Sequence, residues 1–289
     1  MKLVLMAIIL VSFKVSAAEL NLYAIDSPTR LNWKTPKKLL KTTLRNYMRI
    51  GHGKRSRHKI GHAYLGFKCD GEVEVISGMT SGKGFKAKES LLKDKVGMSV
   101  ILIDNNGHFQ NHAESSKDIK IFSDTNRISK LQIEITNDQC LLAKQWHEEY
   151  SNSESFIYGG VDKRPLRGEG SGCTAYAMSF FEVANVDFNF FNKLFLRTIY
   201  IPNDLLGGDY GLGEKVKVKK ILADRRLLSV STPDSLQVDL YDPNDMHEWI
   251  KKTWKDVEEG AVNADIAEYN AKAYSVDKMK VLKLKKKDL

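Results

Sequence analysis

The chain has 289 residues, of which 42% are hydrophobic, 9% aromatic and 28% charged. This balance excludes a disordered polymer, a collagen-like repeat and a polytopic membrane protein. Lysine and arginine outnumber the acidic residues by 45 to 36, so the surface favours anionic partners without identifying them. We therefore expect a globular protein with one sizeable domain and an extension.

The first residues have the layout of a cleaved secretory signal. Lys2 precedes an apolar run over residues 3–13, and the small residues 16–18 come directly before Glu19. The run is too short to span a bilayer. We expect residues 1–18 to be removed and the protein to be periplasmic or secreted. In that oxidising compartment, three cysteines permit one internal bridge and leave one thiol free.

The first half of the chain predicts mostly strands. After a short strand over residues 20–25, Thr35 and Pro36 supply the N-cap and first-turn proline of a helix. Residues 51–59 form a basic segment. Strand-like patterns then follow over residues 62–67, 72–77, 99–103, 118–122 and 131–136.

The second half predicts mostly helices. Thr136 and Gln139 form a capping box, and a strongly apolar helix begins near Cys173. Towards the end, an amphipathic helix over residues 246–257 stops at Gly260, and residues 266–274 suggest another. The basic segment 278–287 fits a solvated strand or a frayed end. We expect a main domain over residues 19–235 and a C-terminal helical extension with a basic tail over residues 236–289.

The sharpest candidate for chemistry is Cys173. Three glycines at positions 168, 170 and 172 allow a tight turn before it, and the apolar residues after it begin a buried helix. At a helix N-terminus the dipole favours a thiolate, and backbone N–H groups can hold an oxyanion. A buried structural cysteine, or half of a disulfide, is the alternative.

A thiol nucleophile needs a base, and His62 suits this role because it opens a strand directly after Gly61. The pair His108 and His112 could bind a metal on a helix, but the sequence offers no third ligand in a recognisable pattern, and we expect no metal site. The remaining histidines are expected in the basic segment or on helix surfaces, namely His52, His58, His147 and His247.

These motifs resemble the NlpC/P60 branch of the papain-like cysteine hydrolases. In that family a tyrosine and a glycine pair precede a cysteine that starts a buried helix, similar to Phe156-Ile157-Tyr158-Gly159-Gly160 and Gly172-Cys173-Thr174 here. The family also opens a strand with Gly-His, similar to Gly61-His62. Because the histidine precedes the cysteine, the chain is similar to the circularly permuted members, which include lecithin:retinol acyltransferase-like proteins. The resemblance covers roughly residues 55–190, and Gly172 replaces the usual Asp or Asn.

The resemblance implies an α+β fold in which an antiparallel sheet packs on helices and the nucleophile heads a helix. It implies that Cys173 attacks an acyl carbon, that His62 moves the proton, and that Tyr158 assists the oxyanion hole, with no cofactor. A third polar residue on the next strand would orient His62. We assign it to Glu74, with Glu72 as the alternative, because Glu74 lies 12 residues after His62. If Cys173 is the free thiol, Cys69 and Cys140 remain as a possible bridge.

The favoured function is therefore an exported cysteine hydrolase that cleaves amide bonds in peptidoglycan peptides or proteins. One alternative uses the same residues for acyl transfer or ester hydrolysis on lipids. The other is a non-catalytic basic protein that binds anionic envelope polymers. Peripheral envelope association would use the basic segments 51–59 and 278–287. Nucleic acid is not an expected partner, because the basic residues are dispersed and are not interleaved with aromatic residues.

Overall fold

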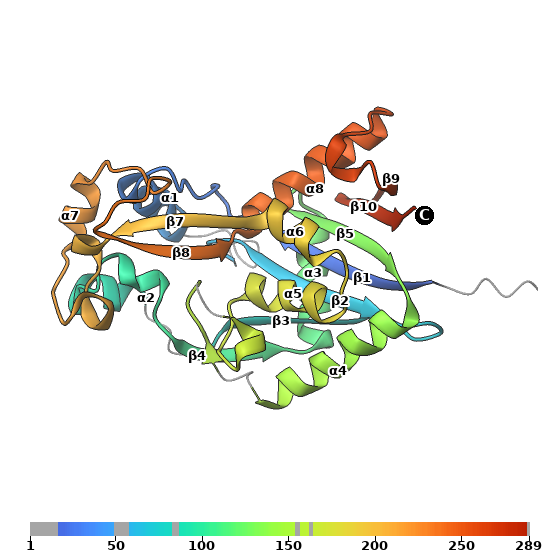
Figure 1. Ribbon diagram of the computed structural model, residues 1–289, viewed down its shortest axis with the longest axis horizontal. Coiled ribbons are helices and arrows are strands. Elements are labelled where there is room, and N and C mark those ends of the chain that lie inside the picture. The colour runs from blue at the N-terminus through green and yellow to red at the C-terminus, as the bar shows by residue number, and fades with distance from the viewer. Residues whose placement is uncertain (1–16, 49–57, 83–86, 154–156, 162–163, 288–289) are drawn as a thin grey trace, which may run out of the picture.

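The molecule is built around one large β-sheet, whose strands lie one below another at the centre and right of Figure 1. The computed structural model describes residues 17–48, 58–82, 87–153, 157–161 and 164–287. Within these residues the sheet has eight strands in the order β6-β4-β3-β2-β1-β5-β10-β9. The strands are β1 (Ala18–Ile25), β2 (His62–Lys68), β3 (Val75–Ser81), β4 (Asn105–Gln110), β5 (Ile128–Ile135), β6 (Ile157–Tyr158), β9 (Tyr269–Val276) and β10 (Met279–Lys286).

Helices pack on both faces of this sheet, and one face packs on more of them than the other. Alternate residues of a strand point to opposite faces, so Leu20, Leu22 and Ala24 of β1 share one face with Ala63 and Leu65 of β2. That face packs on α4 (Asn137–Ser153), α5 (Cys173–Val183), α6 (Phe188–Phe195) and α8 (Pro243–Glu258).

The opposite face is covered by a single helix among the described elements, α3 (His112–Ser123). Its Ile119 and Phe122 pack against Ile25 of β1 and Tyr64 of β2. His62 lies on the same face of β2 as Tyr64. The histidine therefore begins a strand whose two faces are buried against different helices.

A smaller lobe extends from the sheet, at the left of Figure 1. Strands β7 (Leu196–Pro202) and β8 (Ser235–Tyr241) form a two-stranded antiparallel ribbon. The lobe also holds α1 (Pro36–Met48), the short helix α2 (Ala87–Glu89) and α7 (Val218–Ala223). It has its own apolar core, which includes Leu39, Leu40 and Ile221.

Two predicted helix starts are confirmed, and each is fixed by a side-chain cap. Lys38 N donates to Thr35 Oγ1 at 3.2 Å at the start of α1. At the start of α4, Thr136 N donates to Gln139 Oε1 at 3.0 Å and Gln139 N donates to Thr136 Oγ1 at 3.2 Å. These local signals survive folding because they satisfy backbone groups that a helix end leaves unpaired.

Two predicted strands are wrong. Residues 99–103 overlap a 3₁₀ turn, Met98–Ile101, and residues 118–122 lie in helix α3. A capping box between Asn111 and Glu114 starts that helix. Ile119 and Phe122, three residues apart, then share its buried face. The apolar pattern of this short segment is compatible with the period of a helix and with that of a strand. The capping box at Asn111 favours the helix.

The C-terminal segment corrects a further expectation. Residues 269–276 form strand β9 instead of the expected helix, and the segment 278–287 contains strand β10, which pairs parallel to β5. Met279, Leu282 and Leu284 of β10 are buried. The predicted helices of the extension are therefore correct for α8 and wrong for β9. For residues 278–287 the strand alternative is confirmed by β10, although the strand is partly buried and not solvated. The expectation of a purely antiparallel sheet is wrong as well, because the sheet is mixed.

The predicted signal segment lies outside the described residues except for Ala17 and Ala18. Ala18 already pairs with Ile135 in the sheet, and cleavage after it stays a prediction. Across the described parts of the chain, none of the helices has the length and apolar character needed to span a bilayer.

Candidate active site

Cys173 is the first residue of α5 and is buried, with 7% of its surface exposed. Gly172 is the N-cap and offers no side-chain oxygen to the helix, so the first turn keeps backbone N–H groups that no side chain caps. The other two cysteines, Cys69 and Cys140, are joined by a disulfide. Cys173 is thus the free thiol, at the helix N-terminus expected from the glycine-rich sequence.

Two polar groups from distant parts of the chain lie close enough to the Cys173 sulfur to lower the pKa of the thiol. One is the backbone N–H of Ala63 in β2, and the other is the hydroxyl of Tyr158 in β6. Ala63 directly follows His62, and neighbouring Cα atoms are about 3.8 Å apart. The structure therefore brings Cys173, Tyr158 and the start of the histidine strand together.

An opening in the sheet makes this meeting possible. Strand β3 pairs with β2 only through Phe67, Gly66 and Leu65, and from Gly78 onward it pairs with β4. Ala63 lies beyond the last β2–β3 pair. At the divergence the Tyr64 ring lies over Gly78, where an added Cβ would be 2.7 Å from Tyr64 Cδ1. A larger residue at position 78 would displace that ring.

His62 is buried and belongs to a closed polar network. Its Nε2 lies 3.1 Å from Gln110 Oε1. Gln110 Nε2 donates to the Tyr64 hydroxyl at 3.1 Å, and that hydroxyl donates to Asp118 Oδ2 at 3.0 Å. The imidazole of His58 stacks on His62 with 4.2 Å between ring centroids. Its Nε2 lies 3.2 Å from Asp118 Oδ2, so His58 contacts both ends of this network.

The direction of these bonds fixes the tautomer of His62. Because the amide nitrogen of Gln110 donates to Tyr64, its oxygen faces the histidine, and His62 Nε2 must carry the proton. Nδ1 is then the basic nitrogen. Within the described residues Nδ1 has no hydrogen-bond partner, and no hydrogen bond joins His62 to the Cys173 sulfur. An amide that orients a histidine is the arrangement of Cys-His-Asn sites.

Burial keeps both groups of the pair neutral. It raises the pKa of the Cys173 thiol to about 11, although the donors Ala63 and Tyr158 pull in the opposite direction. Burial, and next the neighbouring His58, lower the pKa of His62 well below its usual value. At rest the thiol of Cys173 and the imidazole of His62 are therefore both neutral. His62 shares a face of β2 with Tyr64, whereas α5 packs on the opposite face.

Glu74 does not fill the role predicted for it. The residue precedes β3, and its carboxylate accepts hydrogen bonds from Asn21 Nδ2 at 2.7 Å and from the Tyr23 hydroxyl at 2.9 Å. It lies against Gly66, four residues along β2 from His62, a separation of about 13 Å. The alternative, Glu72, pairs with Lys144 on the surface. The structure gives the orienting position to Gln110 instead.

Other histidines also differ from expectation. The sequence predicts a solvated His58, but only 9% of its side chain is exposed. It predicts His147 and His247 on helix surfaces, yet His147 contacts Ser77 and Tyr176. His247 is buried against Ser129. A side chain's solvent exposure depends on the elements that pack over it, which a local pattern does not reveal.

The sequence predicts no metal cluster, and the described residues contain no group of three or more His, Cys, Asp or Glu side chains placed to hold an ion. His108 pairs with Glu114, and His112 Nδ1 accepts from the backbone of Ile76. The two histidines thus have separate partners.

Comparison of the chain with family models, with curated proteins and with solved structures found no match to any of them.

Proposed function

We propose that the chain is an exported cysteine hydrolase of permuted papain-like fold that cleaves amide bonds in envelope peptides or proteins. The observation that carries the proposal is the meeting of three elements at one sulfur. Cys173 heads α5, Ala63 N–H approaches the sulfur from the histidine strand, and Tyr158 donates to it. Gln110 replaces Glu74 as the residue that orients His62.

The reaction starts from neutral partners. As the Cys173 sulfur bonds to the substrate carbonyl carbon, its proton moves to Nδ1 of His62. Nε2–H of His62 stays on Gln110 and holds the ring in place. The tetrahedral intermediate collapses when the C–N bond breaks and His62 returns the proton to the leaving amine. Water then hydrolyses the thioester by the same proton route, and backbone N–H groups at the start of α5, with Tyr158, support the oxyanion.

The test is labelling with a thiol-directed acyl probe together with digestion of peptidoglycan peptides, protein substrates and an ester. The proteins are residues 19–289 as wild type, Cys173→Ala and His62→Ala. The matched control is His108→Ala, because His108 is exposed and its ion-pair partner is Glu114, outside the site. Labelling of Cys173 that requires His62 but not His108, with release of an amine, supports the proposal. Turnover of the ester alone would move the assignment to the lipid acyltransferase or esterase alternative.

A second candidate is a non-catalytic protein that binds anionic envelope polymers. It is favoured by the raised pKa of the Cys173 thiol and by the missing hydrogen bond between His62 and Cys173. The same experiment separates the two candidates. Equal labelling rates in wild type and His62→Ala, with no product from any substrate, would favour the binding protein.

A further inference from the structure

Helix α1 carries a stripe of cations. Residues 27–48 contain no aspartate or glutamate, and Lys37, Lys41 and Arg45 are spaced four apart, so they lie on one helix face. Lys38 lies beside them. Within the described residues none of these four side chains forms an ion pair. The opposite face packs into the core of the smaller lobe through Leu39 and Leu40. The stripe is therefore uncompensated positive charge on a rigid element.

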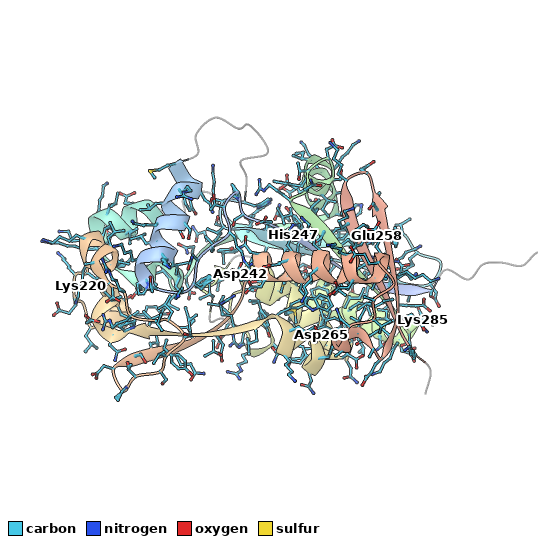
Figure 2. All side chains as sticks on the ribbon, turned by 90° about the horizontal axis from the view of Figure 1, so that it is seen from above. Lys220, Asp242, His247, Glu258, Asp265 and Lys285 are labelled. Atoms are coloured by element: carbon cyan, nitrogen blue, oxygen red, sulfur yellow. A yellow bond between two sulfur atoms is a disulfide. The ribbon has the colours of Figure 1, made fainter. Side chains whose placement is uncertain are left out.

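Helix α7 extends this surface. It contacts α1, and both views show the two helices side by side at the same end of the molecule (Figures 1 and 2). Lys217 and Lys219 are exposed and without ion pairs among the described residues, whereas Lys220 pairs with Asp204. We call the exposed faces of α1 and α7 the cationic face.

The basic tail, which the sequence predicts to bind anions, lies far from the cationic face and several of its charges are paired within the fold. In Figure 2 the labelled Lys285 of β10 lies at the opposite end of the molecule from Lys220 of α7. Lys283 and Lys285 pair with Glu134, and Lys286 pairs with Asp187. Those charges are compensated within the fold, so they are less available to an external anion.

Exposed apolar side chains end the stripe. Met48 is 67% exposed and Tyr47 47% exposed at the last turn of α1. Cations beside exposed apolar side chains suit the headgroup region of an anionic bilayer, where lysines contact phosphates and apolar groups enter the acyl boundary. A soluble polyanion would use the cations but gain nothing from Met48.

We propose that the cationic face is a docking surface for an anionic phospholipid bilayer. The proposal concerns binding alone, so it holds whether or not Cys173 is catalytic. It assigns envelope association to α1 and α7 instead of the tail. Residues 51–57 of the other basic segment expected to take part lie outside the described residues.

The test is sedimentation with phosphatidylcholine vesicles that contain or lack phosphatidylglycerol, over a salt series. All proteins carry Cys173→Ala, so that hydrolysis plays no part. The stripe variant changes Lys37, Lys38, Lys41 and Arg45 to Gln. The matched control changes Lys117, Lys120, Lys193 and Lys252 to Gln, which removes the same charge from exposed positions elsewhere. Circular dichroism melting checks that each variant is folded.

We expect the stripe variant to lose at least about tenfold in affinity for the anionic vesicles and the control variant to lose less than about threefold. A third variant, Met48→Gln, should weaken binding even at high salt, where screening has removed most of the charge contribution. Equal losses in the stripe and control variants would overturn the proposal. So would wild-type binding that is unchanged without phosphatidylglycerol, or a stripe variant that loses affinity for soluble polyphosphate but not for vesicles.

Discussion

Strand β2 has a polar cluster at each end, and the two clusters differ in kind. At the His62 end, Gln110 and Tyr64 are buried, and they pass hydrogen bonds in one direction from the histidine to Asp118. At the other end, Glu74 is a partly exposed carboxylate held by Asn21 and Tyr23, with Lys130 at 3.9 Å.

The difference separates a structural cluster from a reactive one. A charged carboxylate with its own donors and a nearby lysine is already satisfied and has nothing left to offer a reaction. A buried neutral histidine with one nitrogen held and the other free can still accept a proton. Both clusters lie on one strand, so the depth of burial and the partners, not the residue types alone, decide which end can do chemistry.

The largest expected effect comes from breaking the His62 end. His62→Ala should lower hydrolysis by about a thousandfold, because general base catalysis typically contributes 10²–10⁴-fold. Steady-state turnover of a peptide substrate measures this, with His108→Ala as the control. A loss of less than about tenfold would show that His62 does not take the thiol proton.

The next effect is a pH dependence of the free thiol. With a pKa of about 11, Cys173 stays protonated at neutral pH, and its thiolate fraction rises about tenfold for each pH unit. Iodoacetamide labelling of ligand-free protein should therefore accelerate about a hundredfold between pH 7 and pH 9 without levelling off. A plateau that begins near neutral pH would contradict the neutral pair and indicate a thiolate–imidazolium pair.

Removing the amide of Gln110, which orients His62, should lower turnover less than removing His62 itself. Gln110→Leu leaves His62 in place but frees Nε2–H and the Tyr64 hydroxyl, and we expect turnover to fall about 10- to 100-fold through misorientation of the ring. Its pH profile should shift as well, which a purely structural role would not cause. Gln110→Asn, which keeps the amide, should recover part of the activity. Wild-type turnover in Gln110→Leu would remove this residue from the site.

The smallest effect is expected at Glu74. Glu74→Gln keeps the shape of the side chain, weakens its bonds to Asn21 and Tyr23 and removes its charge interaction with Lys130. Turnover should stay within about twofold while the free energy of unfolding drops by about 1 kcal/mol. Urea titration and the same turnover assay measure both. A loss of turnover as large as that of Gln110→Leu would reverse the comparison between the two ends of β2.

The sequence alone located the parts of the site that depend on local signals. Cys173 follows a glycine-rich turn and heads a helix, and His62 opens a strand, so each could be read within about ten residues of chain. The caps of α1 and α4 are local in the same way. Tyr158 came from its resemblance to a family motif, and its hydroxyl is one of the groups that lower the pKa of the Cys173 thiol.

The orienting residue could not be read in this way. Spacing put Glu74 just before the correct neighbouring strand, but the antiparallel register pairs Leu65 with Ser77 and so carries Glu74 towards the far end of β2. Gln110 reaches His62 only because β3 leaves β2 and pairs with β4, where Gly78 lies opposite Gln110. The divergence of two strands is a tertiary event, and no periodicity within either strand encodes it.

Strand β10 imposes an order on folding. Its Leu282 pairs with Leu131 of β5, so the edge of β5 stays open until a segment about 150 residues further along the chain reaches it. Contacts at such separation form slowly, because a long loop must close before they are gained. Before β10 pairs with β5, the unpaired backbone groups of β5 can pair with other chains. Aggregation then competes with completion of the sheet. A chain that completes its sheet this late also stays incompletely folded for longer.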